Sequence, residues 1–411
     1  MNWEKNTLSN LCFKVTDGTH DSPKSVSSGF PFIKGTHVKK GRIDFDNCEY
    51  LNEDDHLKVI SRSKPEKGDT LFANIGANLG ECAHVNVDFE FSIKNVALFK
   101  PDDKYLNGRF LYFLLSSNFI QTDIISRKSG SAQPFLSLNA LRSYKIIYPA
   151  LETQKRIADI LSDYDDLIEN NLKRIKLLEQ AAQNIYKEWF VNLRFPGHEN
   201  TPINEETGLP EGWGNAELGS VATVQSSKRV FLADYVDIGV PFYRGKEISQ
   251  KVKHEVISEP YFISHEKFRE FDSRFGSPKE NDILITAVGT IGNCYLARKS
   301  DLPFYFKDGN LLWIHSYNEN VSGFYLIQYF QSPIFKEILN SITIGSSQKA
   351  LTITAVKKLN ITVPNNEMLE KFDSIIKPTM NQIEVLAKQN QKLKAARDIL
   401  LPRLMNRTIE V

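Results

Sequence analysis

The stretch LSDYDDLIENNLKRIKLLEQAAQNIYKEW, residues 161–189, decides the fold of this chain. Its apolar residues recur at alternating intervals of three and four, the spacing of a coiled-coil seam, which Asn171 interrupts. The stretch IKPTMNQIEVLAKQNQKLKAARDILLPRL, residues 376–404, carries a similar seam with Asn390, although Pro378 predicts a kink or a restart of the helix there. One such stripe would equally well pack on its own domain, but two copies favour two long helices that pair with each other. The apolar seam positions are Leu161, Ile168, Ile175, Leu178 and Ile185, and then Ile376, Ile383, Leu386, Leu393 and Leu400.

The remainder of the chain is also duplicated. The segment Gly130–Gln133, followed by Pro149, recurs 215 positions later as Gly345–Gln348, followed by Pro364. Further upstream, and with small gaps, Lys34-Gly35 corresponds to Arg244-Gly245. An ordered series of such matches indicates that a unit of about half the chain is present twice.

Each copy begins with short β-branched or alternating runs and one helical segment, which predicts a compact domain of mixed helix and strand. The expected strands are 69–75, 96–100 and 144–148, and then 282–288, 311–315 and 359–363, with helices at 108–126 and 323–340. The predicted fold class is α+β, with two duplicated globular α/β domains separated by two long helices. The predicted boundaries are 1–150 for the first domain, 151–196 for its helix, 197–212 for a linker, 213–364 for the second domain and 365–411 for its helix.

Composition excludes several classes of protein. The 411 residues, 41% hydrophobic and 25% charged, are typical of a chain that folds into two or three domains. No apolar run is long enough for a signal peptide or a membrane span, so we expect a cytoplasmic protein. The four cysteines are scattered, which favours buried thiols over zinc or disulfides.

Catalytic motifs are absent, and the charge is balanced. The sequence contains no Walker loop, H-E-x-x-H, G-x-S-x-G or G-x-G-x-x-G motif, and none of the motifs of an amino-methyltransferase. The histidines form no metal-ligand pattern, so we expect a chain that catalyses nothing alone and holds no cofactor. Because 51 Lys and Arg residues are balanced by 50 Asp and Glu residues, any contact with nucleic acid must be local or shared with a partner.

Polar, glycine-associated segments are the candidates for DNA contact. Lys34 and Arg244 precede glycines at expected strand ends, where they could touch phosphate or lie beside a turn. The two Gly-Ser-x-Gln segments could bind an anion through backbone amides, or they could be tight turns. The candidate DNA-binding residues are Thr16, Asp17, Gly18, Thr19, His20, Lys34, Lys128, Gly130, Ser131 and Gln133 in the first copy, and Ser227, Lys228, Arg229, Arg244, Lys246, Gly345, Ser346, Gln348 and Lys349 in the second.

The segments 149–161, Trp189-Phe190-Val191 and 209–213, together with Asp17–His20 and Gly130–Gln133, resemble the specificity subunit of type I restriction-modification systems over the whole chain. The resemblance implies two target recognition domains that each bind one half of a bipartite, asymmetric sequence in double-stranded DNA. It also implies that the two helices form an antiparallel coiled coil that acts as a ruler. The second helix departs from the family pattern at Glu367–Leu369 and carries Arg397 where the first has Ala182, so the two partner-docking surfaces need not be equivalent.

The resemblance also implies partners. Two modification subunits would bind S-adenosylmethionine and methylate adenine N6, and restriction subunits would cleave distant DNA with ATP and Mg²⁺. The alternative is a coiled-coil scaffold that joins two protein-binding modules. The sequence does not determine the bases recognised, the gap between the half-sites or the presence of an active restriction subunit.

Overall fold

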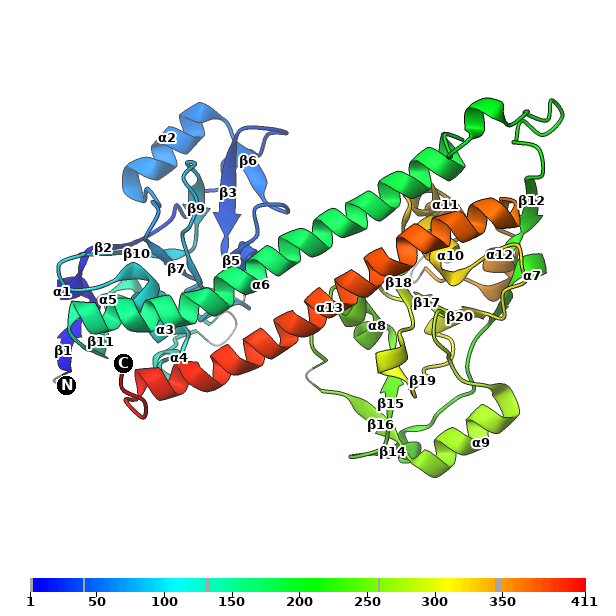
Figure 1. The fold of residues 1–411 in the computed structure, drawn as a ribbon. Coiled ribbons are helices and arrows are strands. Elements are labelled where there is room, and N and C mark those ends of the chain that lie inside the picture. Colours follow the sequence, from blue (N-terminus) through cyan, green and yellow to red (C-terminus); the bar gives the residue numbers. More distant parts are fainter. Residues whose placement is uncertain (1–2, 40, 131–133, 258, 344–348) are drawn as a thin grey trace. The chain divides into compact units, whose positions relative to one another are not determined.

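The computed structural model describes residues 3–39, 41–130, 134–257, 259–343 and 349–411. The chain divides into two compact units, one made of residues 1–169 and 392–411 and the other of residues 170–391. Each unit holds one globular domain. The helices α6 (Leu151–Tyr186) and α13 (Asn366–Met405) contribute to both units (Figure 1).

The first domain is built on a four-stranded antiparallel sheet in the order β2-β10-β7-β8. A second sheet has the order β6-β3-β9, and short ladders join β1 to β11 and β4 to β5. Its strands are β1 (Glu4–Thr7), β2 (Cys12–Asp17), β3 (Phe30–Lys34), β4 (Val38–Lys39), β5 (Arg42–Ile43), β6 (Glu49–Leu51), β7 (Thr70–Phe72), β8 (Cys82–His84), β9 (Ser92–Lys94), β10 (Ala97–Pro101) and β11 (Lys145–Tyr148). Its helices are α1 (Leu8–Leu11), η1 (Gly35–His37), α2 (Glu53–Arg62), α3 (Gly108–Ser116), α4 (Asn118–Ser126) and α5 (Leu138–Arg142).

The second domain repeats the topology of the main sheet and has one more strand in its second sheet. Its sheets have the orders β13-β20-β17-β18 and β14-β16-β15-β19, with a ladder between β12 and β21. Its strands are β12 (Gly214–Glu217), β13 (Thr223–Gln225), β14 (Tyr235–Val236), β15 (Val240–Tyr243), β16 (Tyr261–Ile263), β17 (Ile283–Thr286), β18 (Cys294–Leu296), β19 (Tyr305–Phe306), β20 (Leu311–His315) and β21 (Asn360–Val363). Its helices are α7 (Leu218–Val221), η4 (Leu232–Asp234), α8 (Gly245–Val252), α9 (His265–Phe275), η5 (Lys299–Asp301), α10 (Gly323–Gln331), α11 (Pro333–Ile342) and α12 (Ile353–Lys357), and η2 (Lys187–Val191) and η3 (His198–Asn200) precede it. The duplication predicted from the sequence is confirmed.

Two details differ from the sequence prediction. Each expected helix at 108–126 and 323–340 is a pair of helices, because Ser117 and Ser332 adopt extended backbone conformations between α3 and α4 and between α10 and α11. Ser332 also caps α11 by accepting a hydrogen bond from the backbone N–H of Phe335. Cys48 is half-buried, whereas the other three thiols are buried.

At Pro378 the sequence predicted a kink or a restart of the helix, and the restart is wrong. Helix α13 begins at Asn366 and continues through Pro378 to Met405. A proline removes only one helical hydrogen-bond donor, and buried Phe372, Ile376 and Ile383 flank it on both sides. Packing of this apolar face therefore holds one continuous helix.

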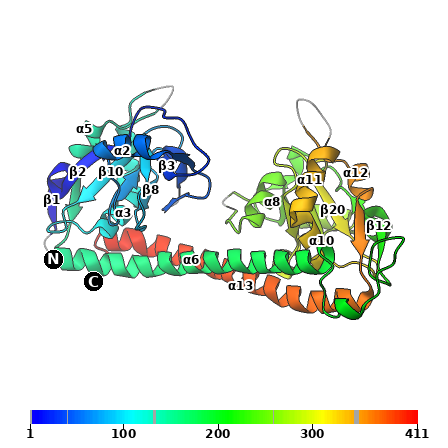
Figure 2. The ribbon, with the colours of Figure 1, turned by 90° about the horizontal axis from the view of Figure 1, so that it is seen from above.

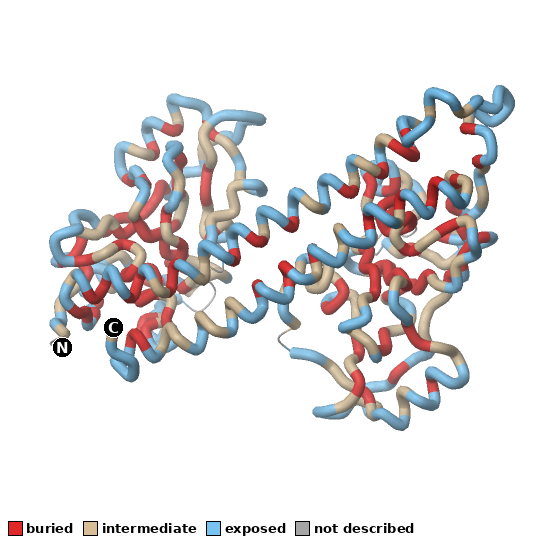
Figure 3. Tube along the Cα trace, viewed as in Figure 1, coloured by how far each residue is buried: buried red, intermediate tan, exposed pale blue. Residues whose placement is uncertain are grey.

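Within each unit the two long helices pack antiparallel. In the second unit, buried Asn171 donates from Nδ2 to Oδ1 of buried Asn390 at 2.9 Å, while further along α6 the ring of Tyr186 lies 6.4 Å from that of Phe372. In the first unit, Arg397 forms an ion pair with Asp165. Alternating buried positions follow the helices in Figure 3. Leu161, Ile168, Ile175, Ile376, Ile383 and Leu386 are buried, whereas Leu178, Ile185, Leu393 and Leu400 are half-buried.

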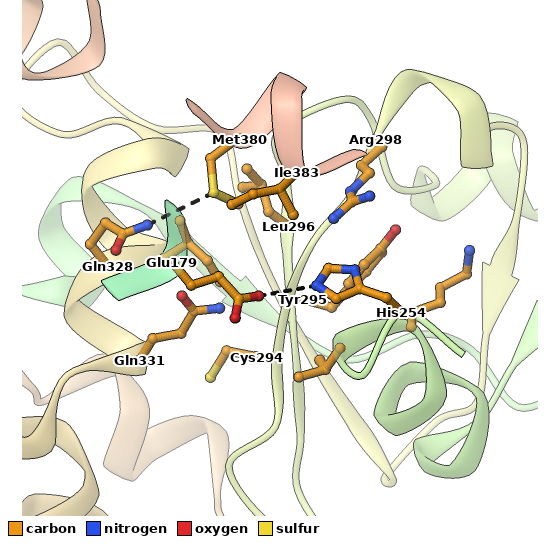
Figure 4. A pocket seen from close by; sticks show the side chains of 13 residues that line it. Glu179, His254, Cys294, Tyr295, Leu296, Arg298, Gln328, Gln331, Met380 and Ile383 are labelled. Carbon is orange, nitrogen blue, oxygen red and sulfur yellow. Dashed lines mark hydrogen bonds and ion pairs between the residues drawn. The ribbon is translucent and has the colours of Figure 1, made fainter. Parts of the chain in front are cut away.

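Polar contacts fix the second domain to the helix segments of its own unit. Figure 4 shows His254, whose Nε2 lies 3.0 Å from Oε1 of Glu179 on α6, at the rim of a small pocket lined also by Met380 and Ile383 of α13. On α6, Gln183 donates to Oε1 of Gln328 at 2.7 Å. The second domain is therefore held by both helices.

Candidate DNA-binding loops

In the first domain, loops from several strand ends meet at one edge. After β2 ends at Asp17, the N–H groups of Gly18 and Thr19 donate to the carbonyls of Val96 and Ile93, each at 3.0 Å. The parallel strands β3 and β9 end side by side at Lys34 and Lys94. These bonds bring the segment that follows β2 to the ends of β3 and β9.

Two further segments complete this edge. Asn78 donates from Nδ2 to the carbonyl of Gly35 at 3.1 Å, which places the segment after β7 beside Lys34. The N–H of Gly76 donates to the carbonyl of Pro134 at 3.0 Å, and Ile75 bridges to Phe135. We call the described residues of 16–20, 34–35, 75–78, 94–95 and 128–136 the first loop edge.

The second domain builds the corresponding edge in the same way. Ser227 donates from Oγ to the carbonyl of Phe306 at 2.6 Å, and the N–H of Lys307 donates to the carbonyl of Tyr243 at 2.9 Å. The N–H of Ala287 donates to the carbonyl of Asn310 at 2.8 Å, and that of Leu351 donates to the carbonyl of Ala287 at 2.9 Å. We call the described residues of 226–229, 243–246, 286–289, 307–310 and 349–351 the second loop edge. Segments that the sequence had placed far apart are thus neighbours in both domains.

A buried carboxylate organises the first loop edge. Asp17 forms an ion pair with Arg62 at the end of α2, and Nε2 of His20 lies 3.1 Å from Oδ2 of Asp17. Nδ1 of His20 lies 2.8 Å from Oδ1 of Asn95. Because Asp17 is 4% exposed while Arg62 and His20 reach solvent, the carboxylate orients the guanidinium of Arg62 and the ring of His20 toward the surface. Arg62 was not predicted from the sequence, since no local pattern connects it with Asp17.

The other residues of this segment belong to the framework. Thr16 and Thr19 are buried. A Cβ on Gly18 would lie 2.1 Å from the carbonyl oxygen of Ile93, so the backbone approach requires glycine. Of the five predicted residues from Thr16 to His20, only His20 has an exposed side chain.

The two predicted phosphate-binding cations are paired within the chain. Nζ of Lys34 lies 2.6 Å from Oε1 of Glu49. Arg244 donates to Oε1 of buried Glu247 at 2.7 Å and stacks 3.9 Å from the ring centroid of Tyr261. Burial alone would raise the pKa of Glu247, but the hydrogen bonds from Arg244 lower it below its usual range, and the pKa of Arg244 is raised in turn. A phosphate would therefore have to compete with these carboxylates.

The remaining predicted residues differ in exposure. Lys128, Gly130, Lys246 and Lys349 are exposed, and Gly130 has a φ of +86° that favours glycine. Lys228 lies 4.9 Å above the ring of Phe275, and Arg229 forms an ion pair with Asp308 at 3.1 Å while its side chain is 70% exposed. The predicted residues Ser131, Gln133, Gly345, Ser346 and Gln348 lie outside the described residues.

In the part of the chain that the structure describes, no three His, Cys, Asp or Glu side chains are placed to hold a metal ion. None of the helices in this part combines the length and the apolar character needed to cross a membrane.

Two copies of one α/β domain, each with an edge of strand-end loops, together with the long helices α6 and α13, define a modular protein with two similar loop edges. The family model described as "Type I restriction modification DNA specificity domain" matches residues 2–180 and 210–395. The chain belongs to this family, the specificity subunits of type I restriction-modification systems.

Individual relatives agree with this assignment. The chain is 29% identical to the type I restriction enzyme MjaIX specificity subunit of Methanocaldococcus jannaschii, over 72% of this chain and 68% of that protein. It is 23% identical to the MjaVIII specificity subunit of the same organism, over 95% of this chain and 92% of that protein. The crystal structure of the type I system S subunit from M. genitalium has the same fold, with a TM-score of 0.60 at 18% identity, covering 98% of this chain and 96% of that one.

Membership of the family defines the general role of the chain. Specificity subunits recognise DNA for a restriction-modification complex and are not catalytic themselves. The absence of catalytic motifs predicted a chain without activity of its own, in agreement with this role.

Proposed function

We propose that this subunit recognises a bipartite, asymmetric sequence in double-stranded DNA, each domain binding one half. The supporting observation is that the same loop edge is built twice with different side chains. The first presents His20 and Arg62 on buried Asp17, whereas the second presents Lys228 and Arg229. Two domains with similar backbones but different exposed side chains suit two different half-sites. Base readout depends on the side chains that reach the groove.

The domain boundaries follow from this proposal. Residues 1–150 and 213–364 are the two target recognition domains, 151–196 and 365–411 are helical spacers, and 197–212 is a linker. Buried contacts between α6 and α13 in each unit, such as the hydrogen bond between Asn171 and Asn390, support a stiff spacer. A stiff spacer makes binding of the second half-site effectively intramolecular.

The partners follow from the family role. Two modification subunits dock on the helices and methylate adenine N6 with S-adenosylmethionine, and restriction subunits use ATP and Mg²⁺ to cleave DNA. These cofactors belong to the partner subunits. The specificity subunit contributes sequence recognition and the placement of its partners.

Exchange of one domain tests the proposal. A host that carries the chain with its modification subunit is compared by methylome sequencing with one in which residues 213–364 come from another specificity subunit. We expect one bipartite adenine mark in the first host, and a mark with one half changed in the second. A methylome without a bipartite mark, or one that the exchange leaves unaltered, contradicts the proposal and favours a scaffold for protein-binding modules.

A further inference from the structure

An apolar surface follows directly after the second loop edge. The side chains of Phe231, Leu232 and Ile238 are 62%, 81% and 88% exposed, and Val236 beside them is also exposed. We call these four residues the apolar tip. They lie in β14 or directly beside it. This strand is an edge strand, because it pairs only with β16 in its sheet. Exposed apolar side chains lower the solubility of a protein, and a contiguous patch of them marks a contact surface.

The framework of the domain does not require the tip. Val236 pairs with Phe262, and its counterpart Val26 in the first domain bridges in the same way to Tyr50. At the same offset of 210 residues, Leu232 corresponds to Ser22 and Ile238 to Ser28, which are both exposed. The first domain therefore forms the same bridge with serines at two of these positions, so the apolar residues there are specific to the second domain.

The tip is continuous with the candidate DNA-binding residues. Arg229 lies two residues before Phe231, and its side chain is 70% exposed. A row of side chains in contact also leads from Arg244, over the ring of Tyr261, to the tilted ring of Tyr235, whose centroid lies 5.4 Å from that of Tyr261. Tyr235 is the first residue of β14, so these contacts connect the strand of the tip with Arg244 of the second loop edge.

Two exposed cations beside the tip favour DNA as its occupant. Lys228 and Arg229 precede the tip, and a phosphate bound by Arg229 would replace its ion pair with Asp308. Two carboxylates are also close: Asp234 accepts a hydrogen bond from the N–H of Phe231 and lies 4.0 Å from Nζ of Lys267, and exposed Asp237 lies between Val236 and Ile238. Apolar side chains cannot hydrogen-bond to base edges. The C5-methyl group of thymine is the apolar feature that the major groove presents to them.

We infer that the apolar tip contacts thymine methyl groups in the half-site bound by the second domain, and so determines part of the sequence specificity. The inference rests on the proposed bipartite recognition. It assigns Leu232 and Ile238 to apolar contacts with bases, and Lys228 and Arg229 to the adjacent phosphates.

Replacement of thymine by uracil tests the contact, because uracil lacks only the C5-methyl group. Once the target has been mapped, duplexes that carry uracil at single thymines of the second half-site are bound to the complex of this chain with its modification subunit. We expect uracil at one or two positions to weaken binding about threefold to tenfold. In the double variant Leu232→Ser/Ile238→Ser, binding to thymine and uracil duplexes should be equal.

Three comparisons complete the experiment. The control Ile203→Ser removes an exposed apolar side chain of the linker and should keep the wild-type preference for thymine. Thermal unfolding should be unchanged in the double variant, because both side chains are exposed. Uracil in the first half-site should change the binding of the wild type and of the double variant by the same factor.

The outcomes separate this inference from the proposed function. A wild type without a bipartite target overturns the function itself. A wild type that binds its bipartite target but does not distinguish thymine from uracil in the second half-site overturns the thymine contact. Loss of the modification subunit from the double variant in size-exclusion chromatography would also overturn it, and would identify the tip as a protein interface.

Discussion

Gly18 lies where the backbone after β2 comes closest to β9. Its N–H donates to the carbonyl of Val96, and an added Cβ would lie 2.1 Å from the carbonyl oxygen of Ile93. We expect Gly18→Ala to destabilise the first domain by about 1–3 kcal/mol, because two backbone segments must move apart. The measurement is urea unfolding. Gly214→Ala is the control, since a Cβ there has no neighbour within 4 Å. Equal urea midpoints for Gly18→Ala and Gly214→Ala would contradict a close backbone approach at Gly18.

At the scale of elements, the pairing of α6 and α13 depends on a buried polar contact in the second unit. Asn171 and Asn390 share a hydrogen bond next to a small apolar cluster of Ile175, Ile383 and Leu386. We expect Asn171→Leu to destabilise the second unit by about 1–3 kcal/mol, because the amide of Asn390 loses this partner in a buried place.

The double variant Asn171→Leu/Asn390→Leu provides the matched comparison. It removes both amides, so its thermal midpoint should recover to the wild-type value or exceed it. The exposed pair Asn170→Leu/Gln391→Leu is the control and should leave the midpoint unchanged. A double variant that is less stable than Asn171→Leu alone would show that the amides do not act as a pair.

The contact between α13 and α10 should depend on pH. Ser322, the N-cap of α10, donates to Oδ1 of Asp373 at 2.8 Å. Burial raises the pKa of Asp373 to about 6, against the opposing effects of this hydrogen bond and of Lys377. The folded state thus holds a proton that the unfolded state releases near pH 4, so stability falls as the pH rises from about 4 to about 6.

The variant Asp373→Asn should not lose stability in this way as the pH rises. We expect its thermal midpoint relative to the wild type to rise between about pH 4 and pH 6 and to stay constant above that range. Ser322→Ala keeps the carboxylate and should retain the dependence on pH. If the thermal midpoints of the wild type and Asp373→Asn change in parallel with pH, this carboxylate does not titrate in that range.

At the scale of the whole molecule, charge predicts how DNA binding is divided among subunits. The net charge of the chain is +1, and Lys34 and Arg244 are paired with carboxylates of the chain itself. We therefore expect the isolated subunit to bind duplex DNA weakly and the complex with modification subunits to supply many phosphate contacts. The logarithm of the binding constant should fall steeply with the logarithm of salt concentration for the complex, and only slightly for the subunit alone. Tight, specific binding by the isolated subunit would contradict this division.

Periodicity and self-similarity within the sequence were enough to predict the long helices, the duplication and the class of fold. These features are local or repeated, so they appear in a one-dimensional pattern. The break at Ser117 and the continuity of α13 through Pro378 were not predicted, because packing of neighbouring side chains decided both.

The candidate loops were found one segment at a time. Thr16–His20, Lys34 and Gly130 stood out as polar segments or as repeated positions. Their assembly into one edge, the orientation of Arg62 by Asp17 and the pairing of Arg244 with Glu247 come from the tertiary structure alone. The physical reason is that periodicity reflects which face of an element is buried, whereas a recognition surface depends on which strand ends the sheet brings side by side.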